Sequence, residues 1–363
     1  MDKQFVNLLI DLLNIKGHSH EERPVADFIL RYCRKHGVNA REDNAARKIN
    51  GNAGNVLAWP KGTDPDKARI LFCSHMDTVD VGNERVIKKS ALGISAGKNH
   101  PIGLDNRLGV ALMLKLLAEE KGDYLCAFTA QEEIGMFGAE EFRMPKGVKA
   151  IYNLDGSQSP GHFVTSTVGC VTFKINLTGL STHAGINPNG GRSVIEMASH
   201  AIAGLRLGMP GSDESVNIGV IHAGTRSNVI PSQAEIIGEA RANSLPKMNA
   251  VIRGIKAAFA RSVKKYGGTM TYVQDDMFKP YAHGKNSPIV KAAAAAISRA
   301  GIKPVFGHYR GGSDANVFNF RGVPAVNLSI GAHNPHSAQE FARTKEMGQA
   351  YRIVKNLLDG AGQ

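Results

Sequence analysis

The chain has 363 residues, which is long enough for about two domains of ordinary size. Apolar residues make up 42% of it and aromatic residues 6%, a composition that suits a folded protein with a sizeable core and excludes a disordered chain. The formal net charge is +12, but the sequence has no zinc-finger spacing, no aromatic-rich RNA-binding segment and no long run of Lys or Arg. We therefore expect a solvated basic surface and no nucleic-acid partner.

The N-terminal part of the chain predicts two helices. Apolar residues recur at helical spacing over residues 2–15, and a second helix should end near Lys35. Ser19 and Glu22 have the spacing of a capping box, and Pro24 suits the first turn of this second helix. We therefore expect Ser19 and Glu22 to cap it.

Three strand-like runs, at residues 68–76, 124–130 and 151–154, lead into residues with carboxylate or imidazole side chains. These residues are His75, Asp77, Glu132, Glu133 and Asp155. The carboxyl ends of parallel strands are where open α/β sheets bind ligands. Two adjacent carboxylates are hard to explain structurally, because like charges repel and burial is costly. Asp105 stands where a loop enters an apolar helix, a position that also suits a helix N-cap.

The pattern changes near Gly169 and predicts a small α+β domain with an antiparallel sheet. Its strands are expected at residues 171–177, 214–222, 233–241 and 269–275, and its helices at 192–207 and 247–266. The first domain resumes with a helix at 288–300, a strand at 325–330 and a final helix at 343–359. We therefore expect a catalytic domain of residues 1–167 and 284–363, with residues 168–283 inserted in it.

The residues at the strand ends, with one late histidine, form a set of metal ligands. Histidines and carboxylates suit Zn²⁺, with Mn²⁺ or Co²⁺ as substitutes. The set is too large for one tetrahedral ion: His75, Asp77, Asp105, Glu132, Glu133, Asp155 and His336. Two metals that share a bridging carboxylate would use five of these residues and leave the others for proton transfer and ligand orientation. Such a site activates water and polarises a carbonyl group.

Eight motifs run through nearly the whole chain: Ser74-His75-Met-Asp77-Thr-Val, Gly103-Leu-Asp105-Asn106-Arg-Leu-Gly109, Glu132-Glu133-Ile-Gly, Leu154-Asp155-Gly156, Thr182-His183-Ala-Gly185, Asn228-Val-Ile-Pro231, Gly311-Gly-Ser-Asp314 and His336-Ser-Ala-Gln-Glu340. Together they resemble the two-zinc peptidase and deacylase family that includes peptidase T, carboxypeptidase G and the aminoacylases. The resemblance implies an α/β fold, with a mixed-sheet catalytic domain that has helices on both faces. It also implies that the inserted α+β domain, with an antiparallel sheet and two helices, is a lid and dimerisation domain.

The resemblance implies roles for the candidate residues. Five would hold two Zn²⁺ ions: Asp105 as the bridge, His75 and Asp155 on one ion, and Glu133 and His336 on the other. Glu132 would be the general base that activates a metal-bridging water, and Asp77 would orient His75. The family usually has Asp-Asp where this chain has Asp105-Asn106, so the local role of Asn106 stays open. The family often has a cis peptide bond at this step, and we predict one here.

Other residues are implied to bind the substrate. His183, from the inserted domain, would stabilise the oxyanion, often in the partner subunit's site. Asn228 and Arg310 match positions that bind polar groups of the substrate. A homodimer through residues 168–283 is implied as well. His336 is preferred over His333 as a ligand, because Ser337 follows it and a glutamate stands four residues further on.

From these features we expect two-zinc-dependent hydrolysis of amide bonds in short peptides, most closely by an aminopeptidase of the tripeptidase type. A deacylase of N-acyl amino acids, or a carboxypeptidase on the same scaffold, is the alternative. A metal-dependent binding protein without catalysis is a further interpretation, against which the retained Glu132 argues. The four cysteines are widely spaced with no Cys-x-x-Cys pair, and the sequence has neither a signal-peptide pattern nor an apolar run of membrane-spanning length, so we expect a cytoplasmic protein with no membrane partner.

Overall fold

A computed structural model of the chain describes residues 1–82, 84–97, 99–211 and 213–360. These residues form two compact units. Unit 1 comprises residues 1–165, 282–308 and 313 onward, and unit 2 comprises residues 166–281 and 309–312. The segment 309–312, predicted as part of the catalytic domain, belongs to unit 2. Here the Val168 N–H donates to the carbonyl of Tyr309, and the Arg241 side chain donates to the carbonyl of Arg310.

Unit 1 is built on an eight-stranded mixed sheet with the order β1-β2-β6-β3-β7-β15-β8-β14. The strands are β1 (Asn39–Glu42), β2 (Val56–Trp59), β3 (Ile70–His75), β6 (Tyr124–Thr129), β7 (Ala150–Gly156), β8 (His162–Thr167), β14 (Val305–Tyr309) and β15 (Ala325–Ser329). Strands β6, β3, β7 and β15 are mutually parallel, whereas β1, β2 and β8 pair antiparallel. All residues of β3 and β6 are buried, as expected for strands covered on both faces.

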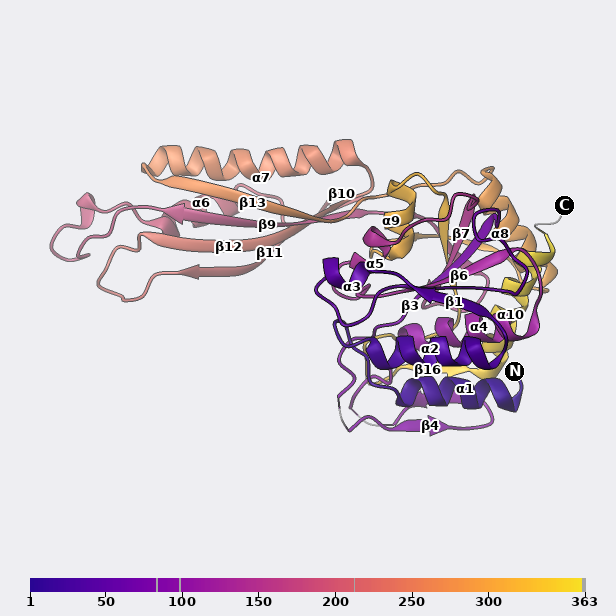
Figure 1. Cartoon of the computed structure of the whole chain (residues 1–363). Coiled ribbons are helices and arrows are strands. Elements are labelled where there is room, and N and C mark those ends of the chain that lie inside the picture. The colour runs from indigo at the N-terminus through magenta and orange to yellow at the C-terminus, as the bar shows by residue number, and fades with distance from the viewer. Residues whose placement is uncertain (83, 98, 212, 361–363) are drawn as a thin grey trace. The chain divides into compact units, whose positions relative to one another are not determined.

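Helices cover both faces of this sheet, as predicted (Figure 1). One face packs in a single hydrophobic core with α1 (Lys3–Asn14), α2 (Arg23–Lys35), α4 (Leu104–Glu119), α8 (Pro288–Arg299) and α10 (Thr344–Asp359). On the other face lie the short helices α3 (Ala45–Lys48), α5 (Phe137–Glu141) and α9 (Asp314–Phe320). Phe72 of β3 points into the core shared with the long helices, whereas its neighbour Cys73 contacts Asp314 of α9 on the other face. Successive residues of this strand therefore pack against the helices on opposite faces of the sheet.

A small sheet in unit 1 has the order β16-β5-β4 and comprises β4 (Ile87–Lys89), β5 (Gly93–Ala96) and β16 (Phe341–Arg343). Strand β16 follows the loop that carries His336, and Phe341 exchanges backbone hydrogen bonds with His333. This pairing therefore fixes both ends of the His336 loop.

Unit 2 has a five-stranded antiparallel sheet with the order β10-β11-β12-β9-β13. The strands are β9 (Gly169–Thr178), β10 (Gly208–Gly211), β11 (Glu214–Ala223), β12 (Gln233–Ala242) and β13 (Thr269–Phe278). Helices α6 (Val194–Ala203) and α7 (Leu245–Tyr266) pack on it, and a 3-10 turn spans Pro188–Gly190. Alternate residues of β9, such as Phe173 and Ile175, are buried in the core that these helices share.

The predicted capping box of α2 is wrong. The helix begins at Arg23, and its N-cap residue Glu22 makes no capping hydrogen bond with its side chain. The side chains of Ser19 and Glu22 instead bond to Asp77 and Gln131, because these partners lie beside the start of the helix in the folded chain. None of the helices in the described part of the chain has the length and apolar composition needed to cross a membrane.

Candidate metal centre

The four parallel strands bring the predicted residues to one edge of the sheet. His75 is the last residue of β3, and Asp155 lies at the end of β7. Glu132 and Glu133 follow β6, and His336 lies in the loop after β15. Parallel strands place their carboxyl ends at the same edge of a sheet, so residues far apart in sequence meet there. Asp105, at the start of α4, completes the cluster.

Asp105 lies between the two histidines. Its Oδ1 is 3.2 Å from Nε2 of His75, and its Oδ2 is 3.3 Å from Nε2 of His336. Each histidine also contacts a second carboxylate, with Asp155 Oδ1 3.2 Å from His75 Nε2 and Glu133 Oε1 2.9 Å from His336 Nε2. The cluster thus consists of two groups of donor atoms that share the Asp105 carboxylate.

The donor set fits a metal ion. One ligand atom each of His75, Asp105 and Glu133 lies within 4.8 Å of the others. Nδ1 of His75 is 3.0 Å from the carbonyl oxygen of Asp77, and a carbonyl only accepts, so Nδ1 carries the proton. Burial opposes protonation of His75, but the carboxylates that Nε2 points at raise the pKa of its imidazole. A bound metal would therefore replace a proton on Nε2 while Nδ1 stays protonated, the usual arrangement of a metal-binding histidine.

The crowded charges shift the pKa values of the cluster. Burial raises the pKa of Asp155 to about 7, and it also raises that of Glu132. Hydrogen bonds to Asp105 and Glu133 raise the pKa of His336 to about 10. Burial acts against ionisation of Asp105, but its hydrogen bonds with the two histidines lower its pKa below the usual range. Protons and a cation therefore compete for this cluster.

Asp77 contacts His75, as predicted, and also three other residues. Its side chain is fully buried, and its Oδ1 is 3.4 Å from His75 Nδ1, farther than its own carbonyl. The same carboxylate accepts the backbone N–H of Glu132 at 3.1 Å and that of Glu133 at 3.2 Å. Ser19 donates to Oδ2 at 2.7 Å. Asp77 thus links the end of β3 to the turn that follows β6.

The peptide bond between Asp105 and Asn106 is cis, as predicted. Asn106, whose role the sequence left open, is fully buried, and its amide donates to Asp155 Oδ1 at 2.9 Å. Its own Oδ1 accepts the N–H of Gly109 at 3.2 Å. Asn153 donates to the other oxygen of Asp155 at 3.4 Å. Two amides therefore orient the Asp155 carboxylate.

Glu340 holds the loop that leads into Asp105. Its carboxylate accepts three backbone N–H groups, from Ile102 at 2.7 Å, Gly103 at 2.8 Å and Asp105 at 3.1 Å. His333, the competitor of His336, bonds to Glu346 at 2.8 Å. The imidazole of His333 is thus engaged in a separate hydrogen bond, and only His336 of the two contacts the carboxylate cluster among the bonds described.

The other predicted residues lie in unit 2. His183 is exposed, and its Nδ1 accepts the N–H groups of Gly185 at 3.1 Å and Ile186 at 3.3 Å. Asn228 is also exposed, and its carbonyl accepts the N–H of Ala184 at 3.0 Å, so the two predicted residues belong to one local structure. The carbonyl of Arg310 accepts a hydrogen bond from Arg241 at 2.7 Å.

Several buried polar residues near the cluster were not identified from the sequence. Glu22 and Gln131 are fully buried and bonded to each other through the Gln131 N–H, and Arg107 is buried beside Asp77. Asp314, named in the sequence only as part of a family motif, accepts hydrogen bonds from Thr129 and Cys73, and burial raises its pKa to about 6. The role of a buried acid can be recognised only from its partners in the folded structure. The Gly-Gly-Ser-Asp motif was the one signal available for Asp314.

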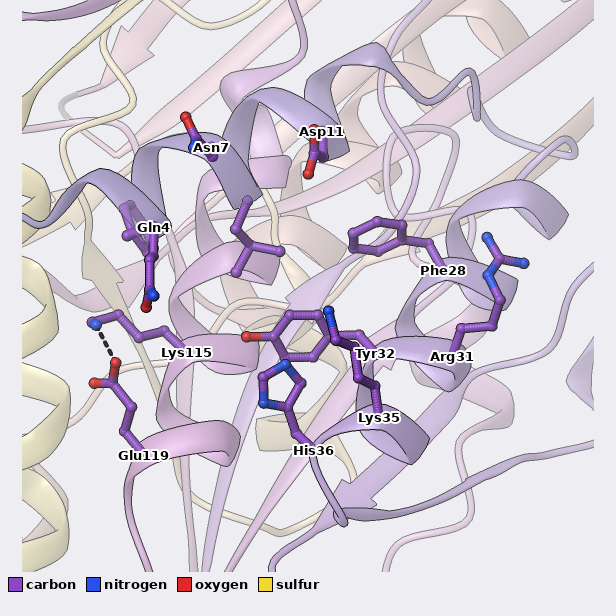
Figure 2. Close-up of a pocket in the computed structure, with 12 residues that line it drawn as sticks. Gln4, Asn7, Asp11, Phe28, Arg31, Tyr32, Lys35, His36, Lys115 and Glu119 are labelled. Atoms are coloured by element: carbon purple, nitrogen blue, oxygen red, sulfur yellow. Dashed lines mark hydrogen bonds and ion pairs between the residues drawn. The ribbon is translucent and has the colours of Figure 1, made fainter.

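A separate groove of about 500 Å³ lies over α1, α2 and α4 and contains none of the predicted site residues (Figure 2). Phe28, Tyr32 and His36 line it as a row one helical turn apart, with the Tyr32 and His36 rings stacked at 4.2 Å. Lys115 and Glu119 form an ion pair at its edge. The groove is distinct from the carboxylate–histidine cluster.

An α/β sheet that presents this donor cluster at the carboxyl ends of its parallel strands defines a metallohydrolase. The model of the peptidase family M20/M25/M40 matches residues 71–360. The chain belongs to this family and is a metallopeptidase.

Individual proteins support this placement. An uncharacterized protein, YqjE of Bacillus subtilis (strain 168), is 28% identical over 371 residues, covering 100% of this chain and 99% of that protein. Peptidase T of Clostridium perfringens (strain ATCC 13124) is 25% identical over 351 residues, covering 81% of this chain and 82% of that protein. The crystal structure of the aminopeptidase PepT from Bacillus cereus ATCC 10987 superposes with a TM-score of 0.92 at 26% identity, covering 99% of each chain.

Proposed function

We propose that the protein is a two-metal aminopeptidase that cleaves short peptides, tripeptides in particular. The observation that carries this proposal is the position of Asp105, whose two carboxylate oxygens each face the Nε2 of a different histidine. A single carboxylate shared by two donor groups can hold two metal ions close together, as two-metal hydrolysis needs. The likeness to peptidase T and to the aminopeptidase PepT supports the substrate class.

Five residues would hold two Zn²⁺ ions, with Mn²⁺ or Co²⁺ as substitutes: His75 and Asp155 on one side of Asp105, and Glu133 and His336 on the other. When bound, such ions polarise the scissile carbonyl and lower the pKa of water. The amides of Asn106 and Asn153 fix the orientation of Asp155, and the carbonyl of Asp77 fixes the tautomer of His75. These contacts hold the ligands ready in position.

Glu132 is the general base in this proposal. Its side chain is 12% exposed, and its Oε2 is 3.9 Å from His75 Nε2. The carboxylate thus lies next to the two proposed groups of metal ligands but belongs to neither. The carboxylate takes a proton from the attacking water and returns it to the amine that leaves. Burial raises its pKa well above that of an exposed glutamate, which suits a group that must accept and release one proton in each cycle. Asp77 places this base by binding its backbone N–H.

The residues of unit 2 would bind the substrate. Nδ1 of His183 accepts two backbone N–H groups, so the ring proton is on Nε2, which makes Nε2 a donor for the oxyanion of the cleaved carbonyl. We assign Asn228 and Arg310 to polar groups of the substrate. We further propose that residues 168–283 are a lid and form a homodimer interface, and that the protein is cytoplasmic, where its four buried, unpaired cysteines stay reduced.

A substrate panel tests this proposal and separates the alternatives. The zinc-loaded protein is given a tripeptide of three different residues, its N-acetylated form and a set of N-acyl amino acids. An aminopeptidase releases the N-terminal residue and is blocked by acetylation. Release of the C-terminal residue from both peptides would identify a carboxypeptidase, and turnover of N-acyl amino acids alone would identify a deacylase. Loss of turnover with a chelator and its return with Zn²⁺ shows that the metal is required.

A further inference from the structure

The segment before α2 lies against the turn that carries the proposed base. Glu22 is fully buried and Ser19 is 8% exposed, although both are polar and precede a helix. Ser19 Oγ donates to Asp77 Oδ2 at 2.7 Å, and Glu22 Oε1 accepts the N–H of Gln131 at 3.0 Å. These side chains connect the N-terminal part of the chain to residues that follow β3 and β6.

Three consecutive backbone N–H groups therefore point at two buried carboxylates. Gln131 donates to Glu22, and the next two residues, Glu132 and Glu133, donate to the two oxygens of Asp77. Gln131 has a φ of 54°, in the left-handed region that residues other than glycine rarely adopt. A backbone in this region persists where the surroundings hold it, and here the two carboxylates do so.

Burying the Glu22 carboxylate costs folding free energy, so the gain from keeping it there is not folding stability alone. Burial raises its pKa to about 6, and one of its oxygens, Oε2, has no hydrogen-bond partner. The nearby cation is Arg107, which is buried and donates to the carbonyls of Met76 and Gly17. A Cβ at Gly17 would lie 2.9 Å from the Arg107 guanidinium, so the segment fits closely around this cation. An apolar side chain is usually the more stable occupant of such a place.

We propose that Glu22, together with Ser19, is a positioning residue of the catalytic centre. Glu22 fixes the backbone at Gln131, Ser19 fixes the carboxylate of Asp77, and both thereby place the side chains of Glu132 and Glu133. This inference rests on the proposed function, because that function makes Glu132 the base and Glu133 a metal ligand. The N-terminal segment is in this view a part of the active site rather than only of the core.

The test compares Glu22→Met with Glu22→Gln. Met has a similar length but offers no oxygen to the Gln131 N–H, whereas Gln retains one. The readouts are kcat and KM for a tripeptide, and the Kd for Zn²⁺ from competition with a chelator. Because a misplacement of about 1 Å costs up to ~10²-fold in rate, Glu22→Met should lower kcat by about tenfold or more, with a smaller change in KM and a weaker Zn²⁺ Kd. Glu22→Gln should keep most of the wild-type kcat and most of the wild-type affinity for Zn²⁺.

Asp66→Leu is the matched control. Asp66 also accepts a backbone N–H, that of Lys146 at 3.1 Å, in the same unit but in the loops that precede β3 and β7, at the opposite ends of these strands from His75 and Asp155. Its replacement should lower stability while kcat and the Zn²⁺ Kd stay at the wild-type values. The inference is overturned if folded Glu22→Met has wild-type kcat and Kd, or if Glu22→Gln is as impaired as Glu22→Met.

If Glu22→Met does not fold, Ser19→Ala decides, since it removes only the hydroxyl that donates to Asp77. Its kcat should fall several-fold while its Tm changes little, and an unchanged kcat would overturn the inference. If the wild-type protein cleaves no peptide, the proposed function fails, but the Zn²⁺ Kd of the Glu22 variants still reports the position of Glu133. An unchanged Kd then overturns the inference separately.

Discussion

The backbone N–H of Glu132 lies 3.1 Å from Oδ1 of Asp77, so the proposed base is positioned by the residue that follows the first histidine ligand by two places. The second oxygen of Asp77 accepts the N–H of Glu133 at 3.2 Å. Asp77→Asn should break this arrangement, because an amide has one acceptor oxygen and its NH₂ group would face a second donor. We expect kcat to fall by about 10²-fold, the cost typical of misplaced catalytic groups, with folding intact by circular dichroism. Wild-type kcat in this variant would remove Asp77 from the mechanism.

Glu132→Gln separates catalysis from metal binding. The variant keeps the size of the side chain and the backbone N–H that Asp77 binds, but it loses the carboxylate that takes a proton. We expect two zinc ions per chain by elemental analysis, as in the wild type, and a loss of about 10²–10⁴-fold in kcat, the usual worth of a general base. Unchanged turnover would assign the base to another residue, and loss of zinc would make Glu132 a ligand.

Asn106→Leu tests the amide that orients Asp155. Leu fills a similar volume but cannot donate to Oδ1 of Asp155. Partners of metal ligands typically contribute about 10–100-fold in metal affinity, so the Zn²⁺ Kd should weaken by that factor. Asn7→Leu, on the exposed part of α1, is the control and should leave the Kd unchanged. A wild-type Kd in Asn106→Leu would mean that Asn153 alone suffices.

Metal affinity should depend on pH near neutrality. Burial raises the pKa of Asp155 to about 7 in the metal-free protein, so a proton occupies this carboxylate below pH 7 and must leave when a metal binds. Through Asp155, affinity therefore falls as the pH drops through 7, by up to about tenfold per pH unit for this one proton, and above pH 7 only the histidine protons still compete with the metal. His336, with a pKa of about 10, must also lose a proton. Calorimetry in buffers of different ionisation enthalpy should show proton release, and an affinity constant from pH 6 to 8 would contradict this account.

Glu340→Leu should destabilise unit 1. The substitution leaves three backbone N–H groups without their acceptor. An unsatisfied buried donor costs about 1–3 kcal/mol, so we expect a loss of about 3 kcal/mol or more in the free energy of unfolding measured with urea. Glu340→Gln, which keeps one acceptor oxygen, should lose less. Equal stability of both variants and the wild type would show that water replaces the carboxylate.

The strand ends could be predicted because their polar residues interrupt strong apolar patterns. His75 and Asp155 stand directly at the ends of buried runs, and parallel strands bring such ends together. The pairing of Asp105 with both histidines came from the family resemblance, since no local pattern places a helix start against residues 30 and 231 positions away. The cis bond at Asp105 likewise came from the resemblance and is confirmed.

The contacts of Ser19 and Glu22 that support the site could not be predicted from the sequence, for a physical reason. Ser19 and Glu22 have the spacing of a local capping box, and local spacing favoured that interpretation. In the fold, both side chains instead satisfy buried groups that come from Asp77 and Gln131, more than 50 residues away in sequence. Side chains that serve long-range partners carry no local periodicity. Their roles therefore appear only with the tertiary structure.

The central claim is that Asp105 bridges two metal ions, and anomalous diffraction at the zinc absorption edge tests it most directly. Crystals of the zinc-loaded protein should show two peaks about 3.5–4 Å apart, the usual separation in two-metal sites. One peak should lie by His75 and Asp155 and the other by Glu133 and His336, with one Asp105 oxygen toward each. A single peak, or peaks away from Asp105, would contradict the account.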